Sequence, residues 1–431
     1  MIPVSEYQQR RQKFSKAIGK GVAVFRSAPH AVMHNDVEYV YRQDSDFYYL
    51  TGFNEAEAVA VIAPNHSKHQ FILFVQPKNL AQEIWTGYRV GVEAAKDLYG
   101  ADIVYSIDEL EEKLPKYLVT GDRIYYHLGL DSKFNERIIN HWQRLIGSYS
   151  KRGSCPSGLE DTTFVLHPLR KIKSEAEIKM MKKAASISVL AHKKAQEVAD
   201  AGRYEYEVQA AIEHVFRSHG GDGIAYPSIV ASGANACILH YIENNRRMEA
   251  GDLLLIDAGC CVGYYNGDIT RTFPVGGEFT PQQKDIYQIV LQAQLSAIEL
   301  VQPGNTYNQF HDKAVETIVE GLKDLKLLQG STEEIVEQKQ YRPFYMHGTG
   351  HWLGLDVHDA GAYKDTEGNW LEFEEGNIVT VEPGIYISPY ITPVEGQVGI
   401  PDYWHGIGVR IEDDVLVTST GNEILTTGLE K

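Results

Sequence analysis

The sequence lacks the long apolar runs and basic runs that membrane and nucleic-acid partners require. No run approaches the ~20 apolar residues that span a bilayer, and the N-terminal segment MIPVSEYQQRRQKF has no apolar signal-peptide core. Lys plus Arg number 41 against 58 Asp plus Glu, which gives a formal net charge of -17. No basic run can follow a phosphate backbone. The sequence therefore predicts a soluble cytoplasmic protein with no membrane span and no nucleic-acid partner.

Cysteine is also scarce, and the signatures of two common enzyme classes are missing. The four cysteines, Cys155, Cys237, Cys260 and Cys261, form no C-x-x-C pair. We interpret them as buried free thiols in a reducing compartment. No G-x-S-x-G or G-x-x-x-x-G-K-[ST] segment occurs, so serine-hydrolase and P-loop chemistry lack their sequence motifs.

What the sequence contains is typical of a two-domain globular protein. A chain of 431 residues exceeds what one hydrophobic core usually serves. Residues 1–170 alternate short apolar runs, such as Val59 to Ile62, with helical stretches, which indicates an α/β domain. Ser174, with Glu177 three residues on, matches a capping box that begins a long helix. We therefore place a second domain at residues 171–431.

The second domain contains a diverged internal repeat. The segment EAGDLLLIDAG at residues 249–259 resembles EEGNIVTVEPG at residues 374–384. Each is a short apolar run of β type that an acidic residue terminates. A helix, turn, helix pattern precedes each copy, and Thr280 begins one of these helices with proline at its first position. Two related halves are expected, in which Asp257 and Glu382 are equivalent.

The carboxylates of this repeat require partners. An unpaired carboxylate at the end of a buried strand costs at least several kcal/mol. The residues after Asp257 can fold back as a hairpin that brings Asp268 beside it, and the strand before Glu412 can return that acid towards Glu382. Four converging anions cannot all ionise unless cations lie between them. A strand-end salt bridge would explain any one acid, but the repeat favours two divalent ions.

Histidines cluster in the segment MHGTGHWLGLDVH at residues 346–358. Its three glycines make a helix unfavourable there, so a loop or strand is expected. Gly348 follows His347, which excludes the H-E-x-x-H pattern of zinc proteases. One imidazole among carboxylate oxygens suits manganese first, with cobalt or zinc as alternatives.

Several motifs together resemble the Xaa-Pro aminopeptidases (the aminopeptidase P family), which belong to the pita-bread metallopeptidases with prolidase and methionine aminopeptidase. The matching segments are YRQDSDF at residues 41–47, LTGF at 50–53, CILHY at 237–241, the histidine-rich segment through Asp359, and VEPG at 381–384. The resemblance spans nearly the whole chain. It implies an α/β (α+β) protein with a creatinase-like N-terminal domain and a pita-bread catalytic domain with an internal pseudo-two-fold repeat.

The resemblance also implies a role for each candidate site residue. The family's metal ligands fall on Asp257, Asp268, His351, Glu382 and Glu412. Glu382 is expected to act as general base as well, His240 and His358 to contact the scissile peptide, and His347 to line the proline pocket. Tyr386 and Arg410 are expected to form a polar link near the metals, which Asp36 joins from the N-terminal domain, and Trp85 to reach across a subunit interface.

The implied activity is hydrolysis of the bond before proline in peptides that begin Xaa-Pro, by a hydroxide that bridges two metal ions. A homo-oligomer, a tetramer or a dimer, is implied with it. Prolidase, which cleaves Xaa-Pro dipeptides, would show the same five ligands and stays open as an alternative. Creatinase lacks the full ligand set. A metal-free binding protein built on this fold is a third alternative, which the retained ligands disfavour.

Overall fold

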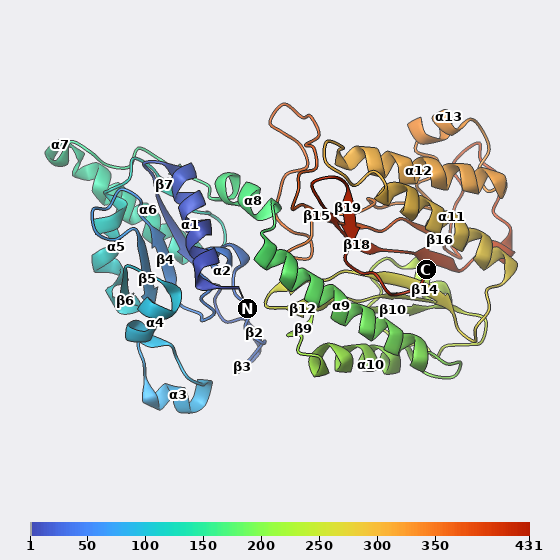
Figure 1. The fold of residues 1–431 in the computed structure, drawn as a ribbon, viewed down its shortest axis with the longest axis horizontal. Helices are drawn as coiled ribbons and strands as arrows, with labels where there is room; N and C mark the ends of the chain where they lie inside the picture. The colour runs from blue at the N-terminus through green and yellow to red at the C-terminus, as the bar shows by residue number, and fades with distance from the viewer. Residues whose placement is uncertain (1) are drawn as a thin grey trace. The chain divides into compact units, whose positions relative to one another are not determined.

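The computed structural model describes residues 2–431. The chain divides into two compact units, with the boundary between Arg170 and Lys171 (Figure 1). Each unit has its own hydrophobic cores. Within the described range, no helix combines the length and the apolar character needed to cross a bilayer.

The N-terminal unit is built on a six-stranded mixed sheet in the order β6-β5-β4-β1-β7-β8. Its central strands are the apolar runs of the sequence, and nearly every residue in them is buried. β1 pairs antiparallel with β4 and parallel with β7. The strands are β1 (Val22–Arg26), β4 (Val59–Ile62), β5 (Phe71–Val75), β6 (Ile103–Ser106), β7 (Ile124–Tyr125) and β8 (Leu159–Glu160).

Helices cover both faces of this sheet, which explains why its strands are apolar throughout. On one face, Val24 and Val61 belong to the same core as Leu114 of α5 (Leu110–Leu118) and Ile138 of α6 (Ser132–Gly147). On the other face, Phe25 packs edge-on against a phenylalanine of α1 (Val4–Ile18), with ring centroids 5.4 Å apart.

Smaller elements complete this unit. They are β2 (Val32–His34), β3 (Val37–Glu38), α2 (Ser45–Thr51), α3 (Leu80–Thr86), α4 (Gly91–Tyr99), α7 (Tyr149–Arg152) and α8 (Thr163–Lys171). β2 and β3 form an exposed antiparallel hairpin. The side chains of α3 have no buried member.

The helices α9 (Glu175–Val198) and α11 (Pro281–Ile298) of the C-terminal unit, Lys171–Lys431, begin where the sequence predicts. Ser174 and Glu177 form the capping box of α9, and Thr280 and Gln283 form that of α11. The helix, turn, helix units are α9 with α10 (Glu205–Ser218) and α11 with α12 (Tyr307–Asp324). In Figure 1 these two pairs lie on opposite sides of the strands of the unit. A short helix, α13 (Thr332–Glu337), follows α12.

The strands of this unit reproduce the predicted repeat. β11 (Leu253–Asp257) lies between β10 (Ile229–Ser232) and β14 (Thr270–Pro274), and packs on α9 and α10. β15 (Ile378–Val381) pairs with β18 (Asp413–Val417), and β18 also pairs with β19 (Asn422–Ile424). β15 packs on α11 and α12. The remaining strands are β9 (Gly223–Ile224), β12 (Cys260–Val262), β13 (Tyr265–Asn266), β16 (Gly384–Ile387) and β17 (Ile407–Arg410).

The hairpin predicted after Asp257 is present as β12 and β13, whose register pairs Cys261 with Asn266. It returns the chain to β14, where Thr270 faces Asp257 directly. All four cysteines are free. Only Cys260 is fully buried and the other three are partly exposed, so the prediction of buried thiols is correct for Cys260 alone.

Candidate metal centre

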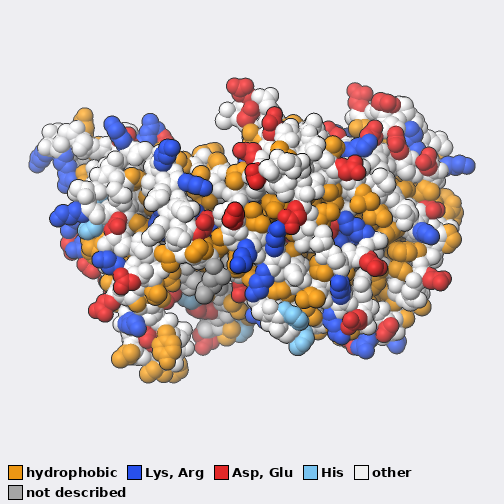
Figure 2. Space-filling model, viewed as in Figure 1, with side chains coloured by type: hydrophobic (Ala, Val, Ile, Leu, Met, Phe, Trp, Pro, Cys, Tyr) orange, Lys and Arg blue, Asp and Glu red, His pale blue; other side chains and the backbone are white. Residues whose placement is uncertain are grey.

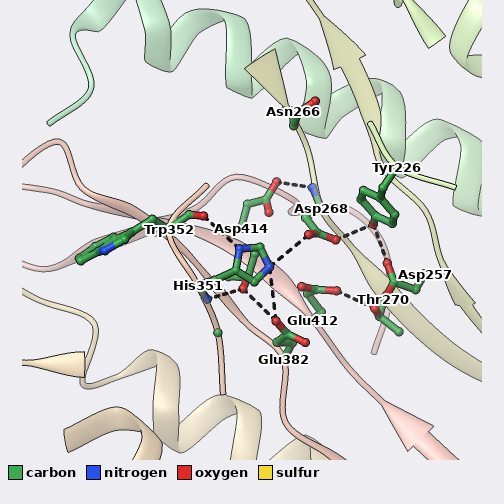
Figure 3. A network of polar contacts seen from close by, with 12 residues as sticks. Tyr226, Asp257, Asn266, Asp268, Thr270, His351, Trp352, Glu382, Glu412 and Asp414 are labelled. Carbon is green, nitrogen blue, oxygen red and sulfur yellow. Dashed lines mark hydrogen bonds and ion pairs between the residues drawn. The ribbon is translucent and has the colours of Figure 1, made fainter. Parts of the chain in front are cut away.

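Strand ends carry the predicted acidic ligands into one place (Figure 3). Asp257 ends β11 and Glu382 follows β15, while Asp268 and Glu412 precede β14 and β18. His351 comes from the glycine-rich loop and has no helical backbone there, as predicted. Donor atoms of Asp268, His351 and Glu412 all lie within 4.8 Å of one another. The Nε2 atom of His351 is 3.5 Å from an oxygen of Asp268 and 3.5 Å from an oxygen of Glu382.

Asp257 joins this group through neighbouring side chains. The hydroxyl of Tyr226 lies 2.5 Å from Oδ1 of both Asp257 and Asp268. Arg410 donates from Nη2 to Oδ2 of Asp257 at 2.8 Å. The hydroxyl of Thr270 donates to Oε2 of Glu412 at 2.6 Å. The acids are therefore oriented by hydrogen bonds as well as by the strands that carry them.

The sequence did not indicate Tyr226 or Thr270. Tyr226 lies between β9 and β10, with no motif around it. Thr270 stands two residues after Asp268, but a threonine in a strand is ordinary. Asp414 was missed as well: its Oδ2 accepts from the backbone N–H of Asp268 at 3.2 Å.

The electrostatics of the site show an excess of buried negative charge. Burial raises the pKa of Asp268, to which the charge of Asp257 adds, and burial raises the pKa of Glu382 to about 7. Burial and the neighbouring acids raise the pKa of Glu412 as well. Burial alone would lower the pKa of His351, but its contact with Asp268 and the charge of Glu382 raise it to about 9. Bound cations would relieve this repulsion, and the oxygen-rich donor set fits hard divalent ions.

A cavity of about 650 Å³ opens onto the ligands Asp257, His351 and Glu382. The predicted substrate-contacting histidines His240, His347 and His358 line it, together with aromatic side chains and the cations Lys364 and Arg410. The other lining residues are Leu239, Tyr307, Gly348, Gly350, Tyr363 and Trp370. The cavity combines aromatic and apolar surface from Leu239, Tyr307, Tyr363 and Trp370 with many titratable side chains.

Arg410, Tyr386 and His347 form one hydrogen-bonded chain beside the ligands. Arg410 donates to the Tyr386 hydroxyl at 3.0 Å, and that hydroxyl lies 2.8 Å from Nε2 of His347. Burial, and next the charge of Arg410, lower the pKa of His347 to about 3, so its ring is neutral. Its Nδ1 lies 2.7 Å from the carbonyl oxygen of Gly348. We therefore assign the proton to Nδ1, which leaves Nε2 to accept from Tyr386.

His358 and His240 occupy different parts of the cavity wall. The ring of His358 lies edge-on to that of His351, with centroids 4.3 Å apart. Burial, and next the charge of His351, lower the pKa of His358. His240 is exposed at the cavity, in the loop that follows the 3-10 turn Gly233–Cys237.

Asp36 and Trp85 both lie in the N-terminal unit. Asp36 is exposed at the turn between β2 and β3, and Trp85 is 87% exposed on α3. The predicted link from Asp36 to Arg410 and Tyr386, and the predicted role of Trp85 at a subunit interface, stay predictions.

Comparisons with known proteins match both units. The model of metallopeptidase family M24 matches residues 179–419, and that of the aminopeptidase P N-terminal domain matches residues 7–125. A Xaa-Pro aminopeptidase of Haemophilus influenzae is 41% identical over 100% of this chain and 96% of its own length. A Xaa-Pro aminopeptidase of Escherichia coli is 40% identical over the same shares.

Solved structures agree with the sequence relatives. Aminopeptidase PepP of Pseudomonas aeruginosa superposes with a TM-score of 0.95 at 43% identity, over 100% of this chain and 97% of the other. A zinc-substituted aminopeptidase P of Escherichia coli, in complex with product, gives a TM-score of 0.93 at 39% identity, over 100% and 96%. The predicted architecture, a creatinase-like N-terminal domain before a pita-bread catalytic domain, is confirmed by these matches.

Proposed function

This chain belongs to metallopeptidase family M24, and we propose that it is a Xaa-Pro aminopeptidase, which removes the first residue from peptides that begin Xaa-Pro. One observation carries the proposal: four carboxylates and an imidazole lie close together, and three of them, Asp257, His351 and Glu382, line a cavity with His240, His347 and His358. The names of the similar proteins support the same activity. The complete ligand set disfavours a binding protein with a degraded site.

We propose that the site holds two divalent cations, with manganese as first choice. Their ligands would be Asp257, Asp268, His351, Glu382 and Glu412. Bound divalent ions lower the pKa of water to near neutrality and so supply a hydroxide nucleophile. Glu382 lines the cavity directly after β15, and we assign to its carboxylate the role of general base, which would take a proton from water.

The residues around the ligands would bind and orient the peptide. His240 and His358 line the cavity, and we assign to them the contacts with the scissile peptide. The neutral ring of His347 suits the wall of an apolar proline pocket, since proline brings a ring and no N–H. Tyr386 binds His347 and Arg410 binds Asp257, and the hydrogen bond between Tyr386 and Arg410 connects the two contacts. Asp36 is proposed to join this link.

The protein is further proposed to be a cytoplasmic homo-oligomer. Four free cysteines are consistent with a reducing compartment. The exposed apolar side chains of α3, which include Trp85, are consistent with a subunit interface. Whether the assembly is a dimer or a tetramer is a question for light scattering.

Prolidase is the rival activity, and the cavity bears on the choice. A dipeptidase must bind the free carboxylate of proline, usually with a cationic group that closes the pocket. Of the two cations that line the cavity, Arg410 already binds Asp257 and Tyr386. The other, Lys364, lies over the ring of Trp370, 4.3 Å from its centroid. These contacts favour an aminopeptidase, in which the chain after proline leaves the site.

The deciding experiment measures initial rates on a Xaa-Pro-Yaa tripeptide and on the matching Xaa-Pro dipeptide, with manganese present. We expect cleavage of the tripeptide, and its loss after chelation or in the Asp257→Asn and Glu382→Gln variants. Glu423→Gln, a change in an exposed carboxylate, is the matched control and should retain the rate. Cleavage of the dipeptide alone would mean prolidase, and full activity after metal removal would exclude the metallopeptidase mechanism.

A further inference from the structure

Lys173 and Asp359 form a buried ion pair in the C-terminal unit. The Nζ atom of Lys173 lies 3.0 Å from Oδ2 of Asp359, and the two side chains are 1% and 2% exposed. Removing two charges from water costs several kcal/mol each, so such a pair is weak evidence for stability. A buried pair can instead specify one arrangement of the chain, and Asp359 directly follows His358, which lines the cavity.

Asp359 organises the loop that carries His358. Its backbone N–H donates to the carbonyl oxygen of Trp352 at 2.8 Å, and its Oδ1 accepts from the N–H of Asp356 at 3.3 Å. A Cβ at Gly354 would lie only 2.2 Å from Oδ2 of Asp359. The loop therefore closes tightly around this carboxylate, and a side chain at position 354 would displace it. His358 directly precedes Asp359 and lies against His351.

Lys173 in turn is fixed to a second part of the site's scaffold. Its backbone N–H donates to the carbonyl oxygen of Gly376 at 2.8 Å. Asn377 donates from Nδ2 to the carbonyl oxygen of Lys171 at 3.2 Å, and Nζ of Lys171 lies 3.0 Å from Glu374. Glu374, Gly376 and Asn377 lie in the turn that leads into β15, the strand that Glu382 follows. These contacts fix the backbone of Lys173 against the turn before β15.

We propose that Lys173 is a positioning residue for the reaction, which acts through Asp359 to fix the imidazole of His358 in the cavity. The inference rests on the proposed function, in which His358 contacts the scissile peptide. The Nζ atom of Lys173 pairs with Asp359 and lies 3.5 Å from the carbonyl oxygen of Lys171, and neither residue is a predicted metal ligand. The effect of Lys173 on the reaction is expected to pass through His358, because Asp359 is the next residue in the same closed loop.

The test compares Lys173→Met with Lys182→Met. Both changes remove an ammonium and leave an unbranched side chain one atom shorter, and Lys182 pairs with Glu423 at the exposed surface of the same unit. Lys173→Met should lower kcat for a Xaa-Pro-Yaa peptide by about 10- to 100-fold, the effect of a misplaced catalytic group. KM and bound manganese should stay near the wild-type values. Lys182→Met should leave all three unchanged.

A double-mutant cycle separates positioning from a general structural role. In a His358→Ala background, Lys173→Met should change kcat by less than about 3-fold, because the group that it positions is already absent. Equal losses of kcat in the two backgrounds would overturn the proposal. If Lys173→Met does not fold, Asp359→Asn replaces it, since the amide keeps the shape of the carboxylate and removes the charge.

Hydrogen exchange tests the same idea without any assay of activity. Amides of residues 353–359 should exchange at least about 10-fold faster in Lys173→Met than in Lys182→Met, since the loop loses its ammonium partner. Unchanged protection of this loop would refute the positioning role even in an active enzyme. If the wild type cleaves no Xaa-Pro peptide, the proposed function fails, and the exchange result still decides whether Lys173 orders the loop.

Discussion

At the scale of single residues, the shared hydroxyl of Tyr226 is the contact that most directly links the two aspartates. It lies 2.5 Å from an oxygen of each. A phenolic hydroxyl has one proton to donate, so the two carboxylates compete for it. Such contacts orient metal ligands. Gly259 permits the close approach of the hairpin between them, because a Cβ there would lie 1.7 Å from the carbonyl oxygen of Gly267.

Tyr226→Phe removes this hydroxyl and nothing else. The variant should fold normally but bind manganese about 10- to 100-fold more weakly, which is the usual cost of losing an outer-shell partner. Calorimetric titration of metal-free protein measures the change. Tyr206→Phe, at an exposed position of α10, serves as the control. Equal affinities in the two variants would show that the strands alone position the aspartates.

His192 gives the molecule a predictable sensitivity to acid. Its Nε2 lies 3.0 Å from the carbonyl oxygen of Ala258, and burial lowers the pKa of the ring to about 4. In the unfolded chain a histidine titrates near pH 6.5. Between about pH 4 and 6.5, His192 is protonated in the unfolded state but neutral in the native state. The contribution of His192 to the free energy of unfolding is therefore fully present above about pH 6.5, and it is lost as the pH falls towards 4.

His192→Gln keeps an N–H for the carbonyl oxygen of Ala258 and removes the titration. At pH 5 this histidine should account for about 2 kcal/mol of the loss in the free energy of unfolding relative to pH 7.5. The variant should lose that much less over the same interval. Denaturant unfolding at both pH values measures the difference. An identical pH dependence in wild type and variant would mean that His192 does not titrate in this way.

At the scale of elements, what the sequence predicts depends on how local the cause is. The sequence predicts the starts of α9 and α11 because each capping residue stands three positions before the residue that completes its capping box. The whole motif is therefore visible in a short stretch of sequence. The repeat of β11 and β15 was predictable because each copy keeps its apolar run and its acid. These signals need no knowledge of the tertiary fold.

Other parts of the site could not be predicted, since their causes lie far apart in the chain. Thr270 contacts Glu412, and Arg271 donates from Nη1 to the carbonyl oxygen of Glu412 at 2.6 Å, across 141 residues. Neither side chain belongs to a motif. The ion pair of Lys173 with Asp359 and the contacts of Tyr226 arise in the same way. Tertiary packing, within one half of the unit for Tyr226 and between its halves for Thr270 with Glu412, defines such pairs.

The cap of α11 gives a test at this scale. The Thr280 hydroxyl accepts from the N–H of Gln283 at 3.3 Å, and Gln283 accepts from the N–H of Thr280 at 2.9 Å. Thr280→Ala should lower the free energy of unfolding by about 1 kcal/mol and leave peptidase activity unchanged. Thr280→Ser retains the hydroxyl and should retain most of the stability. Equal stability of the alanine and serine variants, measured by denaturant unfolding, would rule out this contribution of the cap.

At the scale of the whole molecule, the region of α3 presents a group of large apolar side chains that stay exposed when the N-terminal unit folds. Large side chains on and just after α3 are 78% to 94% exposed: Leu80, Ile84, Trp85 and Tyr88. Figure 2 shows hydrophobic side chains gathered at the tip where α3 lies in Figure 1. An exposed group of this kind marks a binding surface more often than an accident of composition.

We therefore expect α3 to bind a second copy of the chain and to hold the oligomer together. The double variant Ile84→Asp with Trp85→Asp places two charges in the group and should shift the mass in light scattering to that of the monomer. Phe164→Asp, at an equally exposed but separate position of α8, should keep the wild-type mass. The peptidase rate of the monomer then measures the role of assembly, because Trp85 is predicted to reach a neighbouring site. A wild type that is already a fully active monomer would contradict both the interface and that role, since no second copy would be needed to complete the site.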